Sequence, residues 1–408
     1  MRSKADVVFF AKSGASYQIQ HPAGTTELSR LLRSKWPGFV FLACLSVVAI
    51  RPYQHSLYDM DMLGYMGNAV AMSTVDPREI HAAVYQEIFT NVPNPACDHL
   101  LGRDNHILPD QINSPRDRSV DAYHFAEYLP CFAIRPLYNE VLYVLHKAGV
   151  GLVRSTILIA VVSYLGLAIL VFLWLSRYIG QLYAAPFAFL LMISPPILKL
   201  ARFNTPDCLS ALVTLLSLYL LLEVGADLPG YILLLASVYV RTDNAVLVLL
   251  VVAYLSLAAK RLEKSKAAVL ALLAVASVGI INHFSGDYGL KMLYYRSFIS
   301  VPLAPGELVA QFSIGDYLHA FRSGISGLAN GYMLLYLLLG AVGLAARPPR
   351  ELLELALLTL LYTAFHFLLF PSSQERFMGP VYIGLGILGA TAVSSIAATS
   401  RTAKAAAA

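Results

Sequence analysis

Long apolar runs separated by short polar connections dominate the chain. Several of them approach the roughly twenty residues that a helix needs to cross a bilayer. We expect about ten spanning helices, near residues 37–53, 154–175, 182–199, 207–223, 229–241, 244–259, 267–283, 328–346, 351–370 and 378–398. The segments at 37–53 and 229–241 are short. The pattern predicts an all-α polytopic membrane protein.

Two long polar stretches interrupt this pattern, at residues 54–153 and roughly 284–327. In the first stretch, apolar residues recur every three or four positions at 61–73, 77–90 and 132–149, which predicts amphipathic surface helices lying on the outer leaflet. The expected organisation is an N-terminal tail (1–36), a membrane module (37–283) that includes the outer loop 54–153, a second outer loop (284–327), C-terminal transmembrane helices (328–398) and a short tail (399–408).

Composition supports the membrane assignment. Of the 408 residues, 57% are hydrophobic and 13% are charged, and the mean hydropathy is +0.62, far more apolar than a soluble domain. The net charge of +5 does not indicate nucleic-acid binding, because the basic residues form short clusters between apolar runs. These clusters are Arg30, Arg33 and Lys35; Lys260, Arg261, Lys264 and Lys266; Arg347 and Arg350; and Arg401 and Lys404.

The basic clusters also predict an orientation. All of them fall on one side of the membrane if the N-terminus is cytoplasmic, as the excess of Lys and Arg in cytoplasmic loops requires. We therefore expect a multi-pass protein of the plasma membrane, which is the inner membrane in a bacterium, with both long loops outside.

Residues 58–65, YDMDMLGY, place two aspartates just beyond the first expected span. The Asp-x-Asp spacing allows three interpretations: a metal site for a sugar diphosphate, a catalytic base, or a solvated loop in which Asp61 is the N-cap of the next helix. Other expected outer loops also carry charged residues, namely Arg202 and Asp207, Arg241 and Asp243, and Glu375 and Arg376. Because ionisable groups at membrane level are costly and usually functional, this gathering predicts one site at the outer face.

Several motifs carry a resemblance to a known family. Asp61 and Tyr65 open the long loop as Asp-x-x-x-Tyr, Arg135 precedes Pro136 before a surface helix, and Arg154 starts a span after Gly151. Together with TPDCLSALVTL, which contains Asp207, these features resemble the GT-C superfamily of membrane glycosyltransferases, in particular the branch of protein O-mannosyltransferases and lipid A aminoarabinose transferases. The resemblance covers roughly residues 37–225.

The resemblance implies roles for three residues. Asp61 would be the base that deprotonates the acceptor, Arg135 would lie near the donor phosphate, and Asp207 would face the same cavity. Two positions depart from the family pattern, because Met62 stands where the family often has Glu, and Ile134 stands where an acid can precede the basic residue. Both changes remove acidic groups, which argues against a metal assigned by analogy.

The residue chemistry leads to the same function. A site outside the cytoplasm has no nucleotide sugars, so the expected donor is a sugar on a polyprenyl phosphate. Its departing phosphate needs positive charge, for which Arg135, Arg376, Arg202 and Arg241 are the candidates. Asp61 would be the general base, with Asp59 and Asp207 as further catalytic-site carboxylates, Tyr65 in support, and inversion at the sugar carbon.

Several alternatives stay open. A metal is not required because no diphosphate has to be held, but a divalent ion shared by Asp59 and Asp61 remains an alternative. A polytopic transporter or flippase, or a non-catalytic membrane assembly partner, would also explain the spans. The expected partners are the lipid-linked donor, a glycan, lipid or protein acceptor, and membrane lipids, without nucleic acid. An oxidising compartment would allow a disulfide between Cys97 and Cys131. His366 is expected either to face the site or to be buried and hydrogen-bonded.

Overall fold

A computed structural model describes residues 36–103, 115–287 and 313–407, with side-chain surroundings given up to residue 394. These parts of the chain are all-α. The predicted cluster of Arg30, Arg33 and Lys35 and much of the predicted second outer loop lie outside the described residues.

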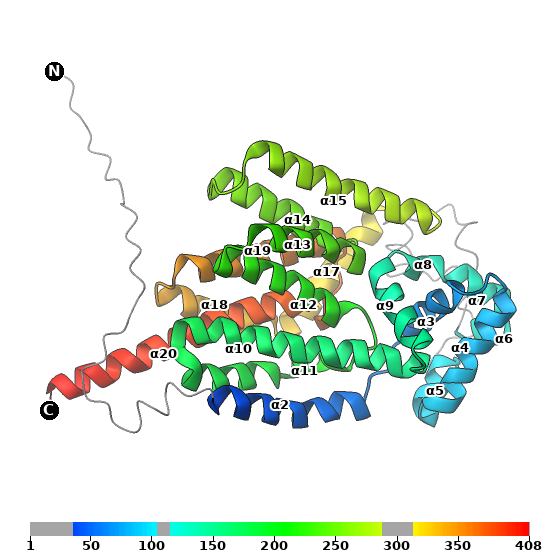
Figure 1. Cartoon of the computed structure of the whole chain (residues 1–408), viewed down its shortest axis with the longest axis horizontal. Coiled ribbons are helices and arrows are strands. Elements are labelled where there is room, and N and C mark those ends of the chain that lie inside the picture. The colour runs from blue at the N-terminus through cyan, green and yellow to red at the C-terminus, as the bar shows by residue number, and fades with distance from the viewer. Residues whose placement is uncertain (1–35, 104–114, 288–312, 408) are drawn as a thin grey trace, which may run out of the picture.

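Most of the helices run side by side along the long axis of the molecule (Figure 1). They are α2 (Trp36–Gln54), α10 (Leu152–Met192), α11 (Pro195–Arg202), α12 (Asp207–Tyr219), α13 (Asp227–Val240), α14 (Asn244–Ala253), α15 (Lys264–Phe284), α17 (Ile314–Asn330), α18 (Met333–Ala345), α19 (Arg350–Leu369) and α20 (Gly379–Ala407). Short π-helical turns extend α12 and α14, namely η1 (Leu220–Val224) and η2 (Tyr254–Ala258), and the 3₁₀ turn η4 (Glu375–Met378) precedes α20.

Six of the helices are long and apolar enough to cross a membrane, or up to seven if the bent pair α17 and α18 forms one span, within the described residues. Every expected span coincides with helix. The expected number of about ten spanning helices is not reached, because some of these helices are too short to cross a membrane by themselves. α13 and the combined α14 and η2 are shorter apolar helices. The expected spans 154–175 and 182–199 begin and end within α10 and α11, and α10 is bent at Gly180 (φ 73, ψ 156), a conformation that favours glycine.

The outer surface of this bundle is apolar. Phe39 and Val47 of α2, Leu272 of α15 and Leu338 of α18 are each about two-thirds exposed. In α2 and α15 only 22% of the most apolar window is buried inside the protein. An exposed apolar surface of this kind marks contact with lipid or with other proteins, and the six or seven apolar helices of the described residues indicate a multi-pass membrane protein.

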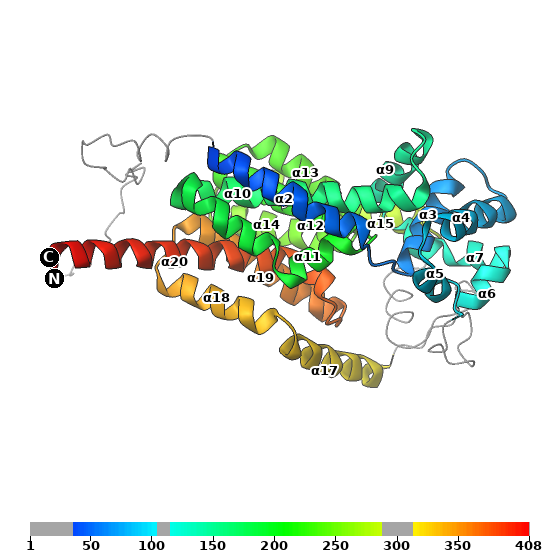
Figure 2. The same ribbon diagram turned by 90° about the horizontal axis from the view of Figure 1, so that it is seen from below.

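The other helices form a compact group at one end of the bundle, which we call the end domain (residues 61–147; Figures 1 and 2). It comprises α3 (Asp61–Ala71), α4 (Pro77–Asn91), α5 (Asn94–Leu100), α6 (Pro115–Val120), α7 (Ala122–Tyr128), α8 (Pro130–Ala133) and α9 (Pro136–Lys147). The amphipathic helices expected at 61–73, 77–90 and 132–149 are confirmed as helices. Their apolar faces build a hydrophobic core of their own with the start of α10, so they do not simply lie flat on lipid as expected.

Close packing fixes the position of α3 in the end domain. A Cβ atom at Gly64 would lie 2.1 Å from the ring of Phe132, so glycine allows α3 to approach α8 directly. Tyr65, one residue further on, packs edge-on against Phe132 and Tyr138. The first turn of α3, with Asp61, is thereby held at the junction between the end domain and the bundle.

The end of the bundle away from the end domain carries arginines that bind acidic side chains or a backbone carbonyl. Arg177 pairs with Glu223 at 3.4 Å, Arg261 donates to the carbonyl of Leu221 at 2.8 Å, and Arg350 binds Glu354 at 2.7 Å. Glu223 follows Asp207 by sixteen positions along α12 and η1, a rise of about 24 Å at 1.5 Å per residue. The two ends of the bundle therefore differ in composition among the described residues, with Arg261 and Arg350 at one end and the aspartates of the candidate site at the other.

Candidate functional site

Two interhelical connections meet where the bundle joins the end domain. The segment between α2 and α3 forms an isolated parallel bridge with the segment between α11 and α12, through Leu57 and Phe203, and Leu57 donates its N–H to the carbonyl of Arg202 at 2.8 Å. This pairing brings the aspartates that follow Leu57 next to the start of α12, where Asp207 lies.

Asp59 and Asp61 have different local roles. The side chain of Asp59 accepts a hydrogen bond from the backbone N–H of Asp61 at 2.9 Å, which satisfies one of the unpaired donors at the start of α3. Asp61 is the first residue of the helix, and Met60 occupies the N-cap position. The interpretation of Asp61 as the N-cap is therefore wrong, because the carboxylate two residues earlier already supplies the acceptor.

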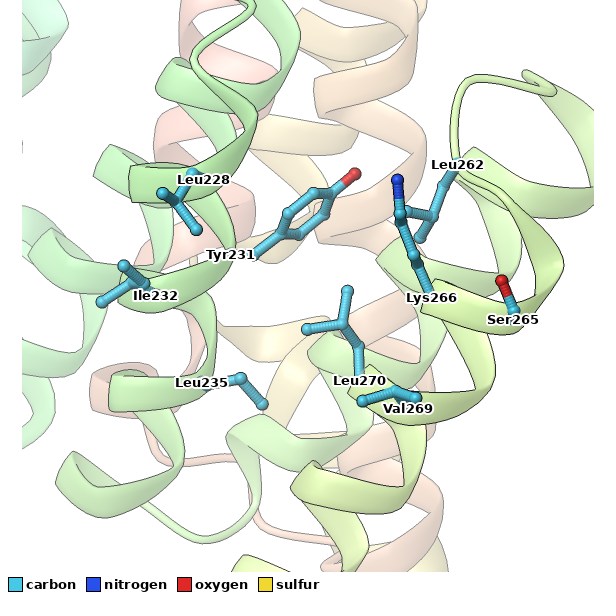
Figure 3. Close-up of a pocket in the computed structure, with 9 residues that line it drawn as sticks. All are labelled: Leu228, Tyr231, Ile232, Leu235, Leu262, Ser265, Lys266, Val269 and Leu270. Atoms are coloured by element: carbon cyan, nitrogen blue, oxygen red, sulfur yellow. The ribbon is translucent and has the colours of Figure 1, made fainter.

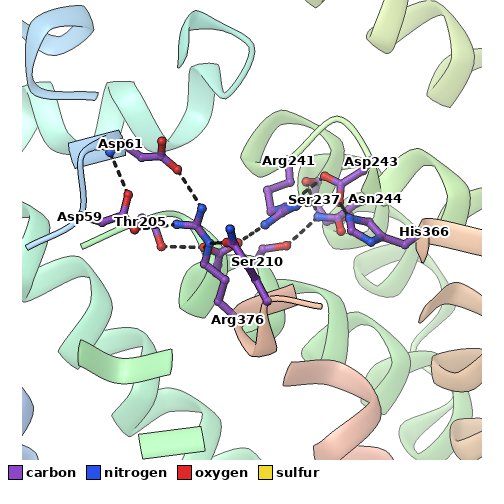
Figure 4. Close-up of polar contacts among 12 residues, drawn as sticks. Asp59, Asp61, Thr205, Ser210, Ser237, Arg241, Asp243, Asn244, His366 and Arg376 are labelled. Atoms are coloured by element: carbon purple, nitrogen blue, oxygen red, sulfur yellow. Dashed lines mark hydrogen bonds and ion pairs between the residues drawn. The ribbon is translucent and has the colours of Figure 1, made fainter. Parts of the chain in front are cut away.

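Arg376 joins these aspartates to the bundle. Its side chain is 10% exposed, and its guanidinium lies 3.0 Å from Asp61 Oδ2, 3.4 Å from Asp59 Oδ2 and 3.9 Å from Asp207 Oδ2. Nε also donates to the side-chain oxygen of Gln374 at 2.7 Å. A single residue of η4 thus contacts three of the carboxylates that the sequence singles out (Figure 4).

Asp207 extends the contacts into the bundle. Its carboxylate is 3% exposed, binds Arg241 directly, and accepts the hydroxyl of Thr205 at 2.6 Å. Arg241 in turn donates to both oxygens of Asp243, at 3.0 and 2.9 Å. The planar guanidinium is suited to such a bidentate contact, and the ring of Phe377 lies 4.7 Å from its central carbon.

The chain of contacts ends at His366 in α19. His366 Nε2 lies 2.9 Å from Asp243 Oδ2, and the imidazole is almost completely buried. Beside it, Asn244 connects Tyr362, Ser210 and the carbonyl of Ser237 through hydrogen bonds of 2.8 to 2.9 Å. His366 is therefore a buried, hydrogen-bonded histidine, which is one of the two alternatives expected for it, and its contact is with Asp243.

We call the connected set of Asp59, Asp61, Arg376, Asp207, Arg241, Asp243 and His366 the charge network. Four carboxylates face two guanidinium groups, so the formal charges of these groups leave the network negative. Burial by itself would raise the pKa of Asp243, but the charge of Arg241 and the contact with His366 hold it well below its usual range. Burial likewise opposes the charge on Arg241, yet Asp243 raises the pKa of the guanidinium.

Two of the predicted phosphate ligands lie beside this network rather than in it. Within the described part of the chain, neither Arg135 nor Arg202 forms an ion pair with the network. Arg202 is exposed at Nε and donates to the carbonyl of His55 at 2.7 Å. Arg135 donates to the carbonyl of Cys131 at 3.3 Å and lies 5.6 Å from the centre of the Tyr65 ring.

Tyr65 separates Arg135 from the network. Its side chain is fully buried, and burial raises the pKa of its hydroxyl to about 12, with opposing effects from the charges of Arg135 and Asp61. The tyrosine is thus a neutral, packed residue between a cation and the aspartates, and its expected role in support of Asp61 stays a prediction.

Two other expectations concern thiols and metals. Cys97 and Cys131 are both buried, and no disulfide joins them in the structure. Among the described residues, no group of three or more His, Cys, Asp or Glu side chains is arranged to hold a metal ion.

Comparisons with family models, with curated proteins and with solved structures found no match for this chain. Its function therefore has to be inferred from its own residues and geometry.

Proposed function

We propose that the chain is an integral-membrane glycosyltransferase that moves a sugar from a polyprenyl-phosphate donor to a glycolipid, polysaccharide or protein hydroxyl. One observation carries the proposal: Asp61 and Arg376, which are 315 positions apart in sequence, lie 3.0 Å apart. A carboxylate and a guanidinium in contact at the membrane edge are the two groups that a metal-independent transfer needs, one to accept a proton and one to stabilise a leaving phosphate.

The reaction follows from these two groups. The oxygen of the acceptor hydroxyl attacks the anomeric carbon, Asp61 takes the hydroxyl proton, and the bond between that carbon and the phosphate oxygen breaks. The electron pair leaves with the polyprenyl phosphate, whose extra negative charge Arg376 stabilises. A single displacement of this kind inverts the anomeric centre.

The charges in the network suggest how binding of the donor would make Asp61 a stronger base. Arg376 faces Asp59, Asp61 and Asp207, and each of its nitrogens already has an acceptor. A phosphate that binds Arg376 must therefore compete with these carboxylates, and it weakens the ion pair that Asp61 makes. In this proposal donor binding makes Asp61 a better proton acceptor, while Arg135, which makes no ion pair with the network in the described residues, supplies additional positive charge.

Asp207 and Arg241 have a positioning role in the proposal. They connect Arg376 to α12 and to the connection between α13 and α14, so that the guanidinium is held at a fixed place when the donor arrives. The proposed orientation puts the network outside the cytoplasm, because the basic clusters gather at the opposite end of the bundle.

A second candidate function is supported by the far end of the network. The row of contacts from Asp61 through Arg376, Asp207, Arg241 and Asp243 reaches the buried His366, and linked carboxylates and histidines inside a membrane bundle are used as proton relays in transporters. A proton-coupled transporter would use the same residues for transport and would form no new glycosidic bond.

The experiment that separates these functions is a transfer assay. The full chain in nanodiscs receives polyprenyl-phosphate sugars labelled in the sugar, with an extract of envelope glycolipids and glycans as acceptor. The glycosyltransferase proposal predicts label in a new product and release of unlabelled polyprenyl phosphate. Uptake of a solute into vesicles without any new glycosidic bond would instead support the transporter.

A further inference from the structure

A pocket lies between α13 and the first turns of α15, far from the charge network. Its volume is about 430 Å³, and it is lined mainly by leucine, isoleucine and valine side chains. It lies along the first half of α13, whereas Arg241 of the network follows the last residue of that helix. From Leu228 to Arg241 the helix rises about 20 Å, so the pocket and the network belong to opposite ends of the bundle.

The pocket has a polar end and an apolar end. Figure 3 shows the hydroxyl of Tyr231 and the ammonium group of Lys266 pointing to the same side, while Leu235, Leu270 and Val269 line the other end. Ile232 and Val269 are each more than half exposed, so the pocket opens on the surface that faces lipid. This arrangement matches an amphipathic ligand whose chain lies along the helices and whose head reaches the membrane surface.

The charge at the polar end indicates an anionic head group. Lys260, Arg261, Lys264 and Lys266 surround the connection into α15, with Glu263 as the acid among them. Lys266 contacts Glu263 at 3.6 Å, but both side chains are about two-thirds exposed or more, and an ion pair of this kind contributes little. Basic groups at the mouth of an apolar groove between membrane helices are a recognised arrangement for acidic lipids.

We propose that this pocket binds one anionic phospholipid, with an acyl chain against Leu235 and Leu270 and the phosphate at Lys266 and Tyr231. A further transmembrane helix is a poorer occupant, because tightly packed helix contacts in membranes use small residues and the lining here is bulky. The site is independent of the proposed transferase activity, and its test measures lipid binding alone.

The test compares two lipids that differ only in charge. The full chain in detergent is titrated with phosphatidylglycerol or with phosphatidylcholine of the same acyl chains, and bound lipids are counted by native mass spectrometry. The proposal predicts a preference for phosphatidylglycerol that falls about fivefold in Lys266→Gln, the effect expected for one basic residue at a membrane surface. The matched control Lys264→Gln removes the same charge two residues earlier, outside the pocket, and should keep the preference.

A second variant tests the apolar end. Leu270→Trp fills the groove and should reduce the binding of both lipids, whereas Lys266→Gln should affect only the anionic one. Equal losses in Lys266→Gln and Lys264→Gln would show a general surface attraction and overturn the proposal. Two other results would also overturn it. One is a wild-type protein that shows no preference for phosphatidylglycerol over phosphatidylcholine, and the other is a second copy of the protein, instead of a lipid, bound at this surface.

Discussion

Arg241 offers the clearest test of the charge network as a structural unit. Its buried guanidinium binds Asp207 and both oxygens of Asp243, so Arg241→Met leaves two carboxylates without their main cation. Breaking a buried ion pair by removing one partner costs about 3–5 kcal/mol. We expect about 3 kcal/mol, the lower end of that range, because Asp207 keeps the hydroxyl of Thr205 and Asp243 keeps His366.

The assay is reversible unfolding of the full chain in mixed detergent micelles, with Arg202→Met as the matched control. Arg202 loses only a hydrogen bond to the carbonyl of His55, for which about 0.5–1.5 kcal/mol is the usual loss. Combining Arg241→Met with Asp207→Asn should give less than the sum of the separate losses, by about 0.5–3 kcal/mol, because the second change removes a charge that the first leaves unpaired. Additive losses, or a loss for Arg241→Met no larger than that of the control, would refute the connected network.

Three further predictions concern single members of the site. The first concerns pH: the folded pKa of Asp243 is well below its usual value, so the stability that its carboxylate contributes is complete above the unfolded pKa of about 3.9 and is lost as the pH falls through the folded pKa. The difference in unfolding free energy between wild type and Asp243→Asn should therefore narrow below pH 4. A difference that stays constant from pH 7 to pH 3 would contradict this. The second concerns the start of α3: Asp59→Ala should lower stability by about 0.5–2 kcal/mol, and Asp59→Asn by much less, because asparagine keeps the acceptor for the Asp61 N–H. Equal losses of stability for the two variants in thermal unfolding would argue against this contact. The third concerns the donor: Arg376→Gln should weaken the use of polyprenyl-phosphate sugars about ten- to a hundredfold, whereas Arg202→Gln should change it little. A larger loss in Arg202→Gln than in Arg376→Gln, measured in a kinetic assay, would move the phosphate site to Arg202.

The sequence predicted the positions of the helices better than the number of described helices that are long enough to span a membrane. Apolar periodicity located all ten segments because burial in lipid and burial in protein both demand apolar side chains. The short segment expected at 229–241 agrees with the 14-residue α13, but the pattern did not show that the spans expected at 154–175 and 182–199 are joined through the single bent helix α10, or that the bend lies at Gly180. These features depend on backbone conformation and on neighbouring helices, which a hydropathy pattern does not record.

The sequence predicted which charged residues gather at the candidate site, but it did not predict which of them contact each other. Charged residues are rare at membrane level, so their positions at the ends of expected spans singled out Asp59, Asp61, Asp207, Arg241 and Arg376, which the structure brings into one set of ion pairs. The sequence grouped Arg241 with Asp243, two positions away, but it could not show that Arg241 and Arg376 also face carboxylates that are 34 to 317 positions away. Thr205 and Gln374, which hold Asp207 and Arg376, were missed because short polar side chains in loops carry no distinctive pattern.

The assignment of Asp61 as the catalytic base is tested most directly by comparing Asp61→Asn with Asp59→Asn. Each change removes one negative charge and one ion pair with Arg376, so a purely structural network predicts similar losses of activity. The catalytic proposal predicts that sugar transfer from a polyprenyl-phosphate donor falls about a hundredfold or more in Asp61→Asn, with unfolding and donor binding close to wild type, and that Asp59→Asn is much milder. A stable Asp61→Asn protein that transfers sugar at the wild-type rate would contradict the proposed function at its centre.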